Sequence, residues 1–250
     1  MHSFVHALVA GRAAMPPTAC FAAAARPGAP RLRRCFATAS RPADAPYPSL
    51  CVFDLDACLW DKEMFEMTAV PTETVTGELR GAGQGVTGAI SGGSVIGLHR
   101  GALRALQEHH AGKYPGMRIA AASSADTPRA VSIGKAALGL LEVVPGTTVW
   151  ELLLQSFGDE RAVQIGRQPP LSADKSATHF PILREATGVP YSEMLFFDDC
   201  NWGDHCGQVA QHCREPGGGP GPVTQRTPRG LTERDWEAGM AKFAERAASR

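Results

Sequence analysis

Short apolar runs alternate with amphipathic stretches along most of the chain, and the apolar runs have the length of buried strands. The predicted strands cover residues 50–56, 117–123, 161–166 and 193–199. Helical periodicity predicts helices over 99–111, 126–141 and 175–188, each with a glycine near its C-terminal end. The alternation of strands and helices along the chain favours right-handed crossover connections between parallel strands. We therefore expect an α/β fold, a three-layer Rossmann-like parallel sheet with helices on both faces.

Two of the helical stretches carry recognisable start signals. The stretch 126–141 opens with Asp126 as an expected N-cap and Pro128 in the first turn. A terminal helix is expected over 231–249, with Thr232 as N-cap and Asp235 as its partner three residues on. Its large apolar side chains recur at helical spacing and predict a packing face: Trp236, Met240 and Phe243.

Two segments depart from the alternating pattern. Residues 72–97 are rich in Gly, Thr and Val, and we interpret them as a flexible hairpin or loop inserted after the first strand. Together with its flanks this insertion spans about 61–98, the size of a minimal cap. The run EPGGGPGP, residues 215–222, cannot be helical and predicts a turn or short linker.

Composition indicates a globular protein without a polyanion-binding surface. Of the 250 residues, 44% are hydrophobic and 20% charged, which is enough apolar content for a core. The 25 basic side chains are matched by 25 acidic ones, and no dense Lys/Arg block stands on a predicted element. No apolar run reaches the roughly 18 residues that span a bilayer. We therefore expect neither a nucleic-acid nor a membrane partner.

The N-terminal segment has a composition of its own. From Met1 to Ala43 there is no Asp or Glu, while six arginines are interspersed with Ala, Pro and Ser. This is typical of an organelle transit peptide, so residues 1–45 are predicted to be a transit peptide or disordered tail and 46–250 the folded domain. A chloroplast and a mitochondrion fit this composition equally well. The alternative is a disordered tail that carries no targeting signal, which would leave the protein in the cytoplasm.

Seven cysteines are an odd number and do not suggest a disulfide framework. One cluster invites a metal interpretation, since it holds five potential ligands: Cys200, His205, Cys206, His212 and Cys213. It has no CxxC pair, so ordinary helix packing is the favoured interpretation. Four other histidines are interpreted as helix-surface or packing residues, to which we assign no chemistry: His99, His109, His110 and His179.

Polar side chains gather where the predicted strands end. Asp54 and Asp56 lie one residue apart, which in a strand places them on one face roughly 6–7 Å apart. Like charges this close need a counter-charge. Because a parallel sheet has its crevice at the carboxyl ends of the strands, other strand-end residues should share that rim: Ser123, Lys175, Asp198 and Asp199. Carboxylates, a hydroxyl and an ammonium suit phosphoryl transfer with magnesium, a hard cation that prefers oxygen ligands.

The order of these segments resembles a known superfamily. FDLDACLW, AAASS, a lysine followed by HF, and LFFDDCNWGD look like the four motifs of the haloacid dehalogenase superfamily. More narrowly, FDLD..LW, ASSADTP, K..THF and EMLFFDD resemble its magnesium-dependent phosphatase type 1 branch. The similarity covers about residues 50–204, and four ordered motifs are far more specific than any one of them.

The resemblance implies a role for each matching residue. Asp54 would be the nucleophile that forms an aspartyl-phosphate, and Asp56 the general acid and then the base. Magnesium would be held by the Asp54 carboxylate, the Asp56 backbone carbonyl and the Asp199 carboxylate, with Asp198 supporting them or as an alternative ligand. The substrate-binding positions would be Leu55, Asp56, Ser123, Ser124 and Lys175, while Asn201 and Asp204 would support the loop. The carboxyl oxygens of Asp54 and Asp199 should then lie within about 5 Å of each other.

Three departures limit the resemblance. Cys58 replaces the usual threonine and is a weaker hydrogen-bond donor, so the site could be held more loosely. Ser124 stands where the narrow branch has arginine, which removes one phosphate or substrate contact. The spacing from Lys175 to His179 is one residue longer than expected.

The resemblance thus implies a haloacid dehalogenase-like domain with a minimal cap and an open site, acting as a phosphoric monoester hydrolase. Substrates would be a phosphoprotein, such as one bearing phosphotyrosine, or a phosphorylated small molecule such as a phosphosugar. A monomer is expected. Two alternatives stay open: a phosphotransferase, which needs a cap that excludes water, and a catalytically weakened binding or regulatory protein, suggested by Cys58 and Ser124.

Overall fold

The computed structural model describes residues 41–42, 45–158 and 160–249. The predicted transit peptide, 1–45, therefore lies outside the described residues apart from 41–42 and 45. Within the described ranges, no helix combines the length and the apolar character needed to cross a membrane. The elements described below all belong to the folded unit that follows residue 37.

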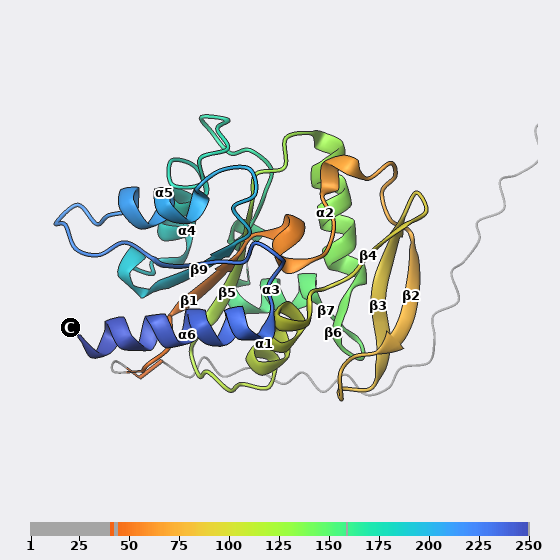
Figure 1. Cartoon of the computed structure of the whole chain (residues 1–250), viewed down its shortest axis with the longest axis horizontal. Helices are drawn as coiled ribbons and strands as arrows, with labels where there is room; N and C mark the ends of the chain where they lie inside the picture. Colours follow the sequence, from red (N-terminus) through yellow and green to blue (C-terminus); the bar gives the residue numbers. More distant parts are fainter. Residues whose placement is uncertain (1–40, 43–44, 159, 250) are drawn as a thin grey trace, which may run out of the picture. The chain divides into compact units, whose positions relative to one another are not determined.

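A five-stranded parallel sheet forms the centre of the fold (Figure 1), in the order β10-β9-β1-β5-β8. Its strands are β1 (Leu50–Phe53), β5 (Arg118–Ser123), β8 (Val163–Ile165), β9 (Met194–Asp198) and β10 (Val223–Arg226). The helices are α1 (Arg100–His110), α2 (Pro128–Leu140), α3 (Val149–Phe157), α4 (His179–Thr187), α5 (His205–His212) and α6 (Glu233–Ala248). The predicted α/β class is confirmed.

Side-chain alternation along β1 divides the core into two layers. Cys51 and Phe53 join the cluster formed with α1, α2, α3 and α6. Leu50 and Val52 join the cluster formed with α4 and α5 on the other face. All four side chains are at most 2% exposed, because a central parallel strand is covered on both sides. Helices therefore cover both faces of the sheet, as predicted.

The terminal helix α6 begins as its sequence indicates. The Thr232 hydroxyl accepts a hydrogen bond from the Asp235 N–H at 3.1 Å, and the Asp235 carboxylate accepts one from the Thr232 N–H at 3.2 Å. Trp236 and Phe243 are each 1% exposed, with Met240 packed beside them. The predicted packing face is confirmed.

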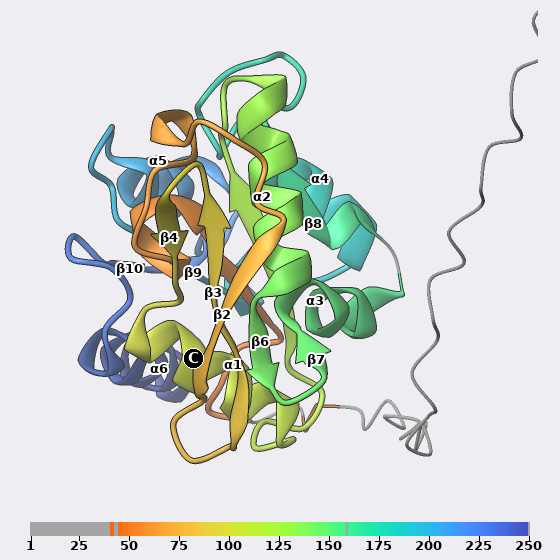
Figure 2. The same ribbon diagram turned by 90° about the vertical axis from the view of Figure 1, so that its right-hand side faces the viewer.

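The inserted segment after β1 is more regular than expected. It forms a three-stranded antiparallel sheet of β2 (Glu73–Glu78), β3 (Gln84–Ser91) and β4 (Ser94–Ile96), which lies beside α2 (Figure 2). A Cβ atom at Gly88 would come within 2.6 Å of a Val95 methyl group, so a glycine lets the strands pack here. The glycine content therefore reflects close strand packing.

Several details of the sequence-based assignment were wrong. The first strand ends at Phe53, and the chain turns within 55–59, where Ala57 has a φ of 50°. The N-cap of α2 is Thr127, whose hydroxyl accepts a hydrogen bond from the Ala130 N–H, and Asp126 lies outside the helix. Helix α3, the small hairpin of β6 (Glu142–Val144) and β7 (Thr147–Thr148), and the edge strand β10 were not predicted.

Candidate active site

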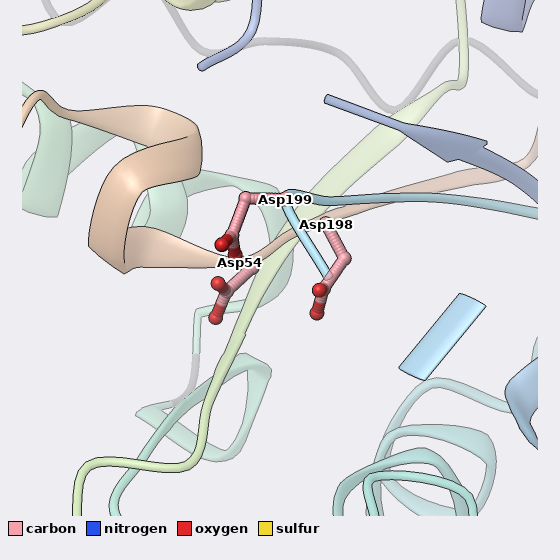
Figure 3. Close-up of side chains that lie close together, drawn as sticks. All are labelled: Asp54, Asp198 and Asp199. Carbon is pink, nitrogen blue, oxygen red and sulfur yellow. The ribbon is translucent and has the colours of Figure 1, made fainter. Parts of the chain in front are cut away.

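Three carboxylates meet where β1 and β9 end. Asp198 is the last residue of β9, Asp199 follows it, and Asp54 follows β1 (Figure 3). Each offers an oxygen, and these oxygens lie within 4.8 Å of one another. The predicted closeness of Asp54 and Asp199 is therefore confirmed. The strands are hydrogen-bonded neighbours, so their carboxyl ends place the side chains at one edge of the sheet.

Lys175 bridges two of these carboxylates. Its Nζ donates to Asp54 Oδ1 at 2.7 Å and to Asp198 Oδ2 at 2.6 Å, and the side chain is 1% exposed. Burial alone would lower the pKa of Lys175, but the charges and hydrogen bonds of Asp198 and Asp54 raise it above its ordinary value. Lys175 is therefore a buried cation at physiological pH.

One ammonium does not balance three carboxylates. Burial raises the pKa of Asp54, and the charges of Asp198 and Asp199 raise it further against the opposing charge of Lys175. Burial and the charge of Asp198 also raise the pKa of Asp199. A divalent cation would supply the missing positive charge, and an all-oxygen donor set suits magnesium. The residues present thus fit the ion that the sequence implied.

Asp198 is engaged more fully than its two neighbours. Its Oδ1 accepts a hydrogen bond from the Cys200 N–H at 2.8 Å. Its Oδ2 accepts one from Lys175 Nζ and lies 3.2 Å from His205 Nδ1. Burial would raise the pKa of Asp198, but Lys175 and His205 hold it well below its ordinary value. Asp198 is thus a fixed anion that orients Lys175, whereas Asp199 accepts a hydrogen bond from the Asn201 N–H at 2.9 Å and shares a side-chain hydrogen bond with Asp54.

Asp56 reaches the same cavity by a different route from the one predicted. It does not continue the strand beside Asp54; the turn after Asp54 carries it to the cavity wall. Its Oδ1 accepts from Trp60 Nε1 at 3.0 Å. Burial raises the pKa of Asp56 to about 7, partly offset by the Trp60 hydrogen bond. A carboxyl group with this pKa can both donate and accept a proton near neutral pH.

Ser123 and His179 form a buried pair beneath the cavity. Ser123 ends β5, lines the cavity and is 2% exposed. Its carbonyl oxygen lies 3.0 Å from His179 Nε2, and because a carbonyl can only accept, Nε2 carries the proton. Burial lowers the pKa of His179 to about 4, so the ring is neutral. His179 was expected to be a helix-surface or packing residue; it is buried and also holds Ser123 in place.

Cys58 has a polar partner that the sequence did not reveal. The Thr227 hydroxyl donates to Cys58 Sγ at 3.3 Å, and the Thr227 N–H donates to the Asp198 carbonyl at 2.9 Å. Both residues are fully buried. The thiol therefore connects the turn after β1 to the end of β10 through Thr227, and the expected loosening at this position is offset by that link.

Asp54, Asp56 and Asp199 face a cavity of about 430 Å³. Six of the predicted site residues line its wall: Asp54, Asp56, Ser123, Ser124, Lys175 and Asp199. It also includes residues that we did not predict: Glu63, Phe65, Arg167, Trp202 and His205. Asp198 and Leu55 lie buried behind the wall, at 0% exposure. Local pattern carried no signal for the unpredicted residues except Trp202, an isolated tryptophan three residues after Asp199.

The cysteine and histidine cluster does not form a metal site in the part of the chain that the structure describes. Cys200, Cys206 and Cys213 are buried free thiols in the core cluster around α4 and α5. The one group of potential metal ligands among the described residues is Asp54, Asp198 and Asp199. The three cysteines therefore pack in the core as expected, whereas His205 lies at the cavity and contacts Asp198.

A protein-family model described as Acid Phosphatase matches residues 46–246, most of the chain. The chain belongs to the acid phosphatase family. This family is of the haloacid dehalogenase type, so the superfamily membership indicated by the four motifs is confirmed. Membership supports phosphatase activity for this chain, and the buried aspartates fit a bound divalent ion. A comparison with curated proteins gave no match.

Proposed function

We propose that this acid phosphatase-family protein is a magnesium-dependent phosphomonoesterase that acts through an aspartyl-phosphate on Asp54. The single observation that carries the proposal is the set of Asp54, Asp198 and Asp199 oxygens within 4.8 Å of one another, with Lys175 on two of the three side chains. A purely structural ion pair would need one carboxylate per lysine. Three clustered carboxylates, two of them on the wall of a cavity, favour a site that binds a cation and a phosphate together.

In the first step a carboxylate oxygen of Asp54 attacks phosphorus, and the bond from phosphorus to the ester oxygen breaks. Asp56, in its protonated form, donates its proton to the departing oxygen. Its pKa of about 7 leaves a large fraction of the acid form available near neutral pH. The products are the free alcohol or phenol and a phosphorylated Asp54.

In the second step Asp56, now a carboxylate, takes a proton from water, whose oxygen attacks the same phosphorus. The bond to the Asp54 oxygen breaks, which regenerates the carboxylate and releases phosphate. Microscopic reversibility makes one residue suitable for both roles, and the Trp60 hydrogen bond keeps Asp56 oriented throughout.

The remaining residues bind charge. Magnesium, when bound, would neutralise the phosphate and the Asp54 carboxylate; we assign it to Asp54, the Asp56 carbonyl and Asp199. Lys175 supplies a fixed positive charge next to the nucleophile. Ser123 and the Leu55 backbone amide are proposed to donate hydrogen bonds to phosphoryl oxygens. The saturated contacts of Asp198 favour a supporting role over that of a ligand.

The geometry favours hydrolysis over the two alternatives. A phosphotransferase must exclude water from the phosphorylated aspartate. Among the described residues that line the cavity, none comes from β2, β3 or β4, and Trp202 on the wall is 73% exposed. A weakened binder was suggested by Cys58, yet that side chain is held by Thr227 within the site. A weakened binder does not account for a proton donor with a pKa near 7.

The proposed function is tested by hydrolysis of an aryl phosphate with and without magnesium. We expect turnover with millimolar Mg²⁺ and a loss of about 100-fold or more after chelation, because the ion contributes several kcal/mol of charge stabilisation. Adding Mg²⁺ back should restore the rate. Calcium, at the same concentration, is the control for ionic strength. Equal rates in chelator and in magnesium would contradict the proposal.

Two exposed aromatic rings favour aryl esters over sugar phosphates. Phe65 and Trp202 line the cavity at 54% and 73% exposure, with ring centroids 5.8 Å apart in an edge-to-face arrangement. Trp202 Nε1 donates to Glu63 Oε1 at 3.1 Å, which limits the motion of the indole. The planar leaving group of an aryl ester can stack on these rings, whereas a sugar has no aromatic face to offer.

Replacing Trp202 with alanine should therefore raise KM for an aryl phosphate about tenfold, from the loss of ring stacking. KM for a hexose phosphate should change less than about twofold. Trp202→Phe, which keeps a ring, should recover most of the affinity. The matched control is Leu171→Ala, which removes an apolar side chain that is 68% exposed and does not line the cavity. An equal loss for both substrates would contradict stacking.

A further inference from the structure

The loop after β8 is tied to the loop after β5. The Gly166 N–H donates to the Ser123 carbonyl at 2.8 Å, and the Arg167 N–H donates to the Ala125 carbonyl at 3.1 Å. Farther along the loop after β8, the Ala173 carbonyl accepts a hydrogen bond from the Ser124 hydroxyl at 3.1 Å. Gly166 has a φ of 101°, a conformation that favours glycine, so the chain turns sharply just before Arg167. These bonds hold the Arg167 backbone next to Ser123.

The charge on the cavity wall makes Arg167 distinctive. Five carboxyl groups line the cavity: Asp54, Asp56, Glu63, Asp126 and Asp199. Its two permanently charged cations are Lys175 and Arg167. Lys175 is buried and donates to two carboxylates, so much of its capacity is already used. A phosphate dianion entering such a cavity needs positive charge that is not already paired.

Arg167 can provide that charge. Its side chain is exposed, and its guanidinium forms no ion pair with any of the described residues. A guanidinium binds two oxygens of a phosphate at once through parallel N–H donors. Ser124, by contrast, turns its hydroxyl to the Ala173 carbonyl and is engaged in holding the loop.

We propose that Arg167 binds the phosphoryl group of the substrate and of the released phosphate. This rests on the proposed phosphatase function and adds a residue to it. The cation stands on the loop after β8, and the hydroxyl of Ser124 anchors that loop. The resembled branch has an arginine at the position of Ser124 itself, so here the positive charge comes from a neighbouring loop of the same cavity.

The test compares Arg167→Gln with Arg129→Gln. Arg129 is an exposed arginine in α2 that does not line the cavity, so the control makes the same change in charge. Binding of inorganic phosphate is measured by titration calorimetry in Mg²⁺, and KM is measured for an aryl phosphate and a hexose phosphate. We expect Arg167→Gln to weaken phosphate about 10- to 100-fold and to raise both KM values by a similar factor. Arg129→Gln should match wild type within about twofold.

The outcomes separate this inference from the proposed function. Unchanged phosphate binding in Arg167→Gln overturns the inference, even if one KM rises, because the arginine then contacts the leaving group. Weakened phosphate binding, with the circular dichroism spectrum and melting temperature of wild type, supports it. Calorimetry needs no turnover, so an inactive wild-type protein would count against the phosphatase proposal without deciding the role of Arg167.

Discussion

Asp54→Asn is expected to lower kcat by about 10⁴-fold or more while the protein remains folded, because an amide cannot form the phosphorylated intermediate. The variant keeps the size of the side chain, and Lys175 keeps its partner Asp198 at 2.6 Å. The buried ammonium is therefore not left unpaired. The measurement is single-turnover and steady-state hydrolysis of an aryl phosphate in Mg²⁺, with circular dichroism as the check on folding.

Asp126→Asn is the matched control for this variant. Asp126 is an exposed carboxylate on the wall of the same cavity, and it has no place in the proposed mechanism. Its substitution removes the same charge near the substrate, and kcat should change less than about threefold. A folded Asp54→Asn protein with activity near that of Asp126→Asn would exclude Asp54 as the nucleophile.

Lys175→Met is expected to destabilise the fold by about 3–5 kcal/mol, because it leaves Asp54 and Asp198 buried without their shared cation. Urea unfolding at neutral pH measures this loss. The control is Lys135→Met, at an exposed position in α2, which should change stability by less than about 0.5 kcal/mol. A loss below about 1 kcal/mol for Lys175→Met would show that the bridge does not support the fold.

The pH dependence of this loss follows from the shifted pKa values of Lys175 and Asp198. The pKa of Lys175 is raised in the fold, so its contribution is complete below its ordinary value of about 10.4 and is lost as pH rises beyond the folded value. The pKa of Asp198 is lowered, so its contribution is present above about 3.9 and is lost as pH falls through the folded value. The difference between wild type and Lys175→Met should therefore shrink as pH falls into the acid range in which Asp198 takes up a proton.

The sequence predicted those parts of the site that depend on local order. A run of apolar residues that ends in a carboxylate indicates both a buried strand and the side chain at its tip. Asp54, Ser123, Asp198 and Asp199 could therefore be placed at one rim. The prediction that Asp56 continues the strand was wrong, because the pattern of polar residues does not show where the chain turns. The positive φ at Ala57 arises within the folded turn.

Contacts between distant segments were not predictable in the same way. Strand β10 has four residues, too few for a clear alternation, and helix α5 separates it in the sequence from its partner β9. Thr227 acts on Cys58 across 169 positions of sequence, and His179 acts on Ser123 across 56. Single polar residues of this kind show no periodicity, so their partners are visible only in three dimensions.

By itself, the sequence determined the parallel sheet, the tips of its strands and the surplus of acidic groups there, because burial and side-chain alternation are local properties of a chain. The tertiary structure decided which charges meet and which stay available. It paired Lys175 with Asp54 and Asp198, and it brought Arg167, Phe65 and Trp202 to the same cavity. Those distances depend on how separate loops pack against one another, which no local pattern encodes.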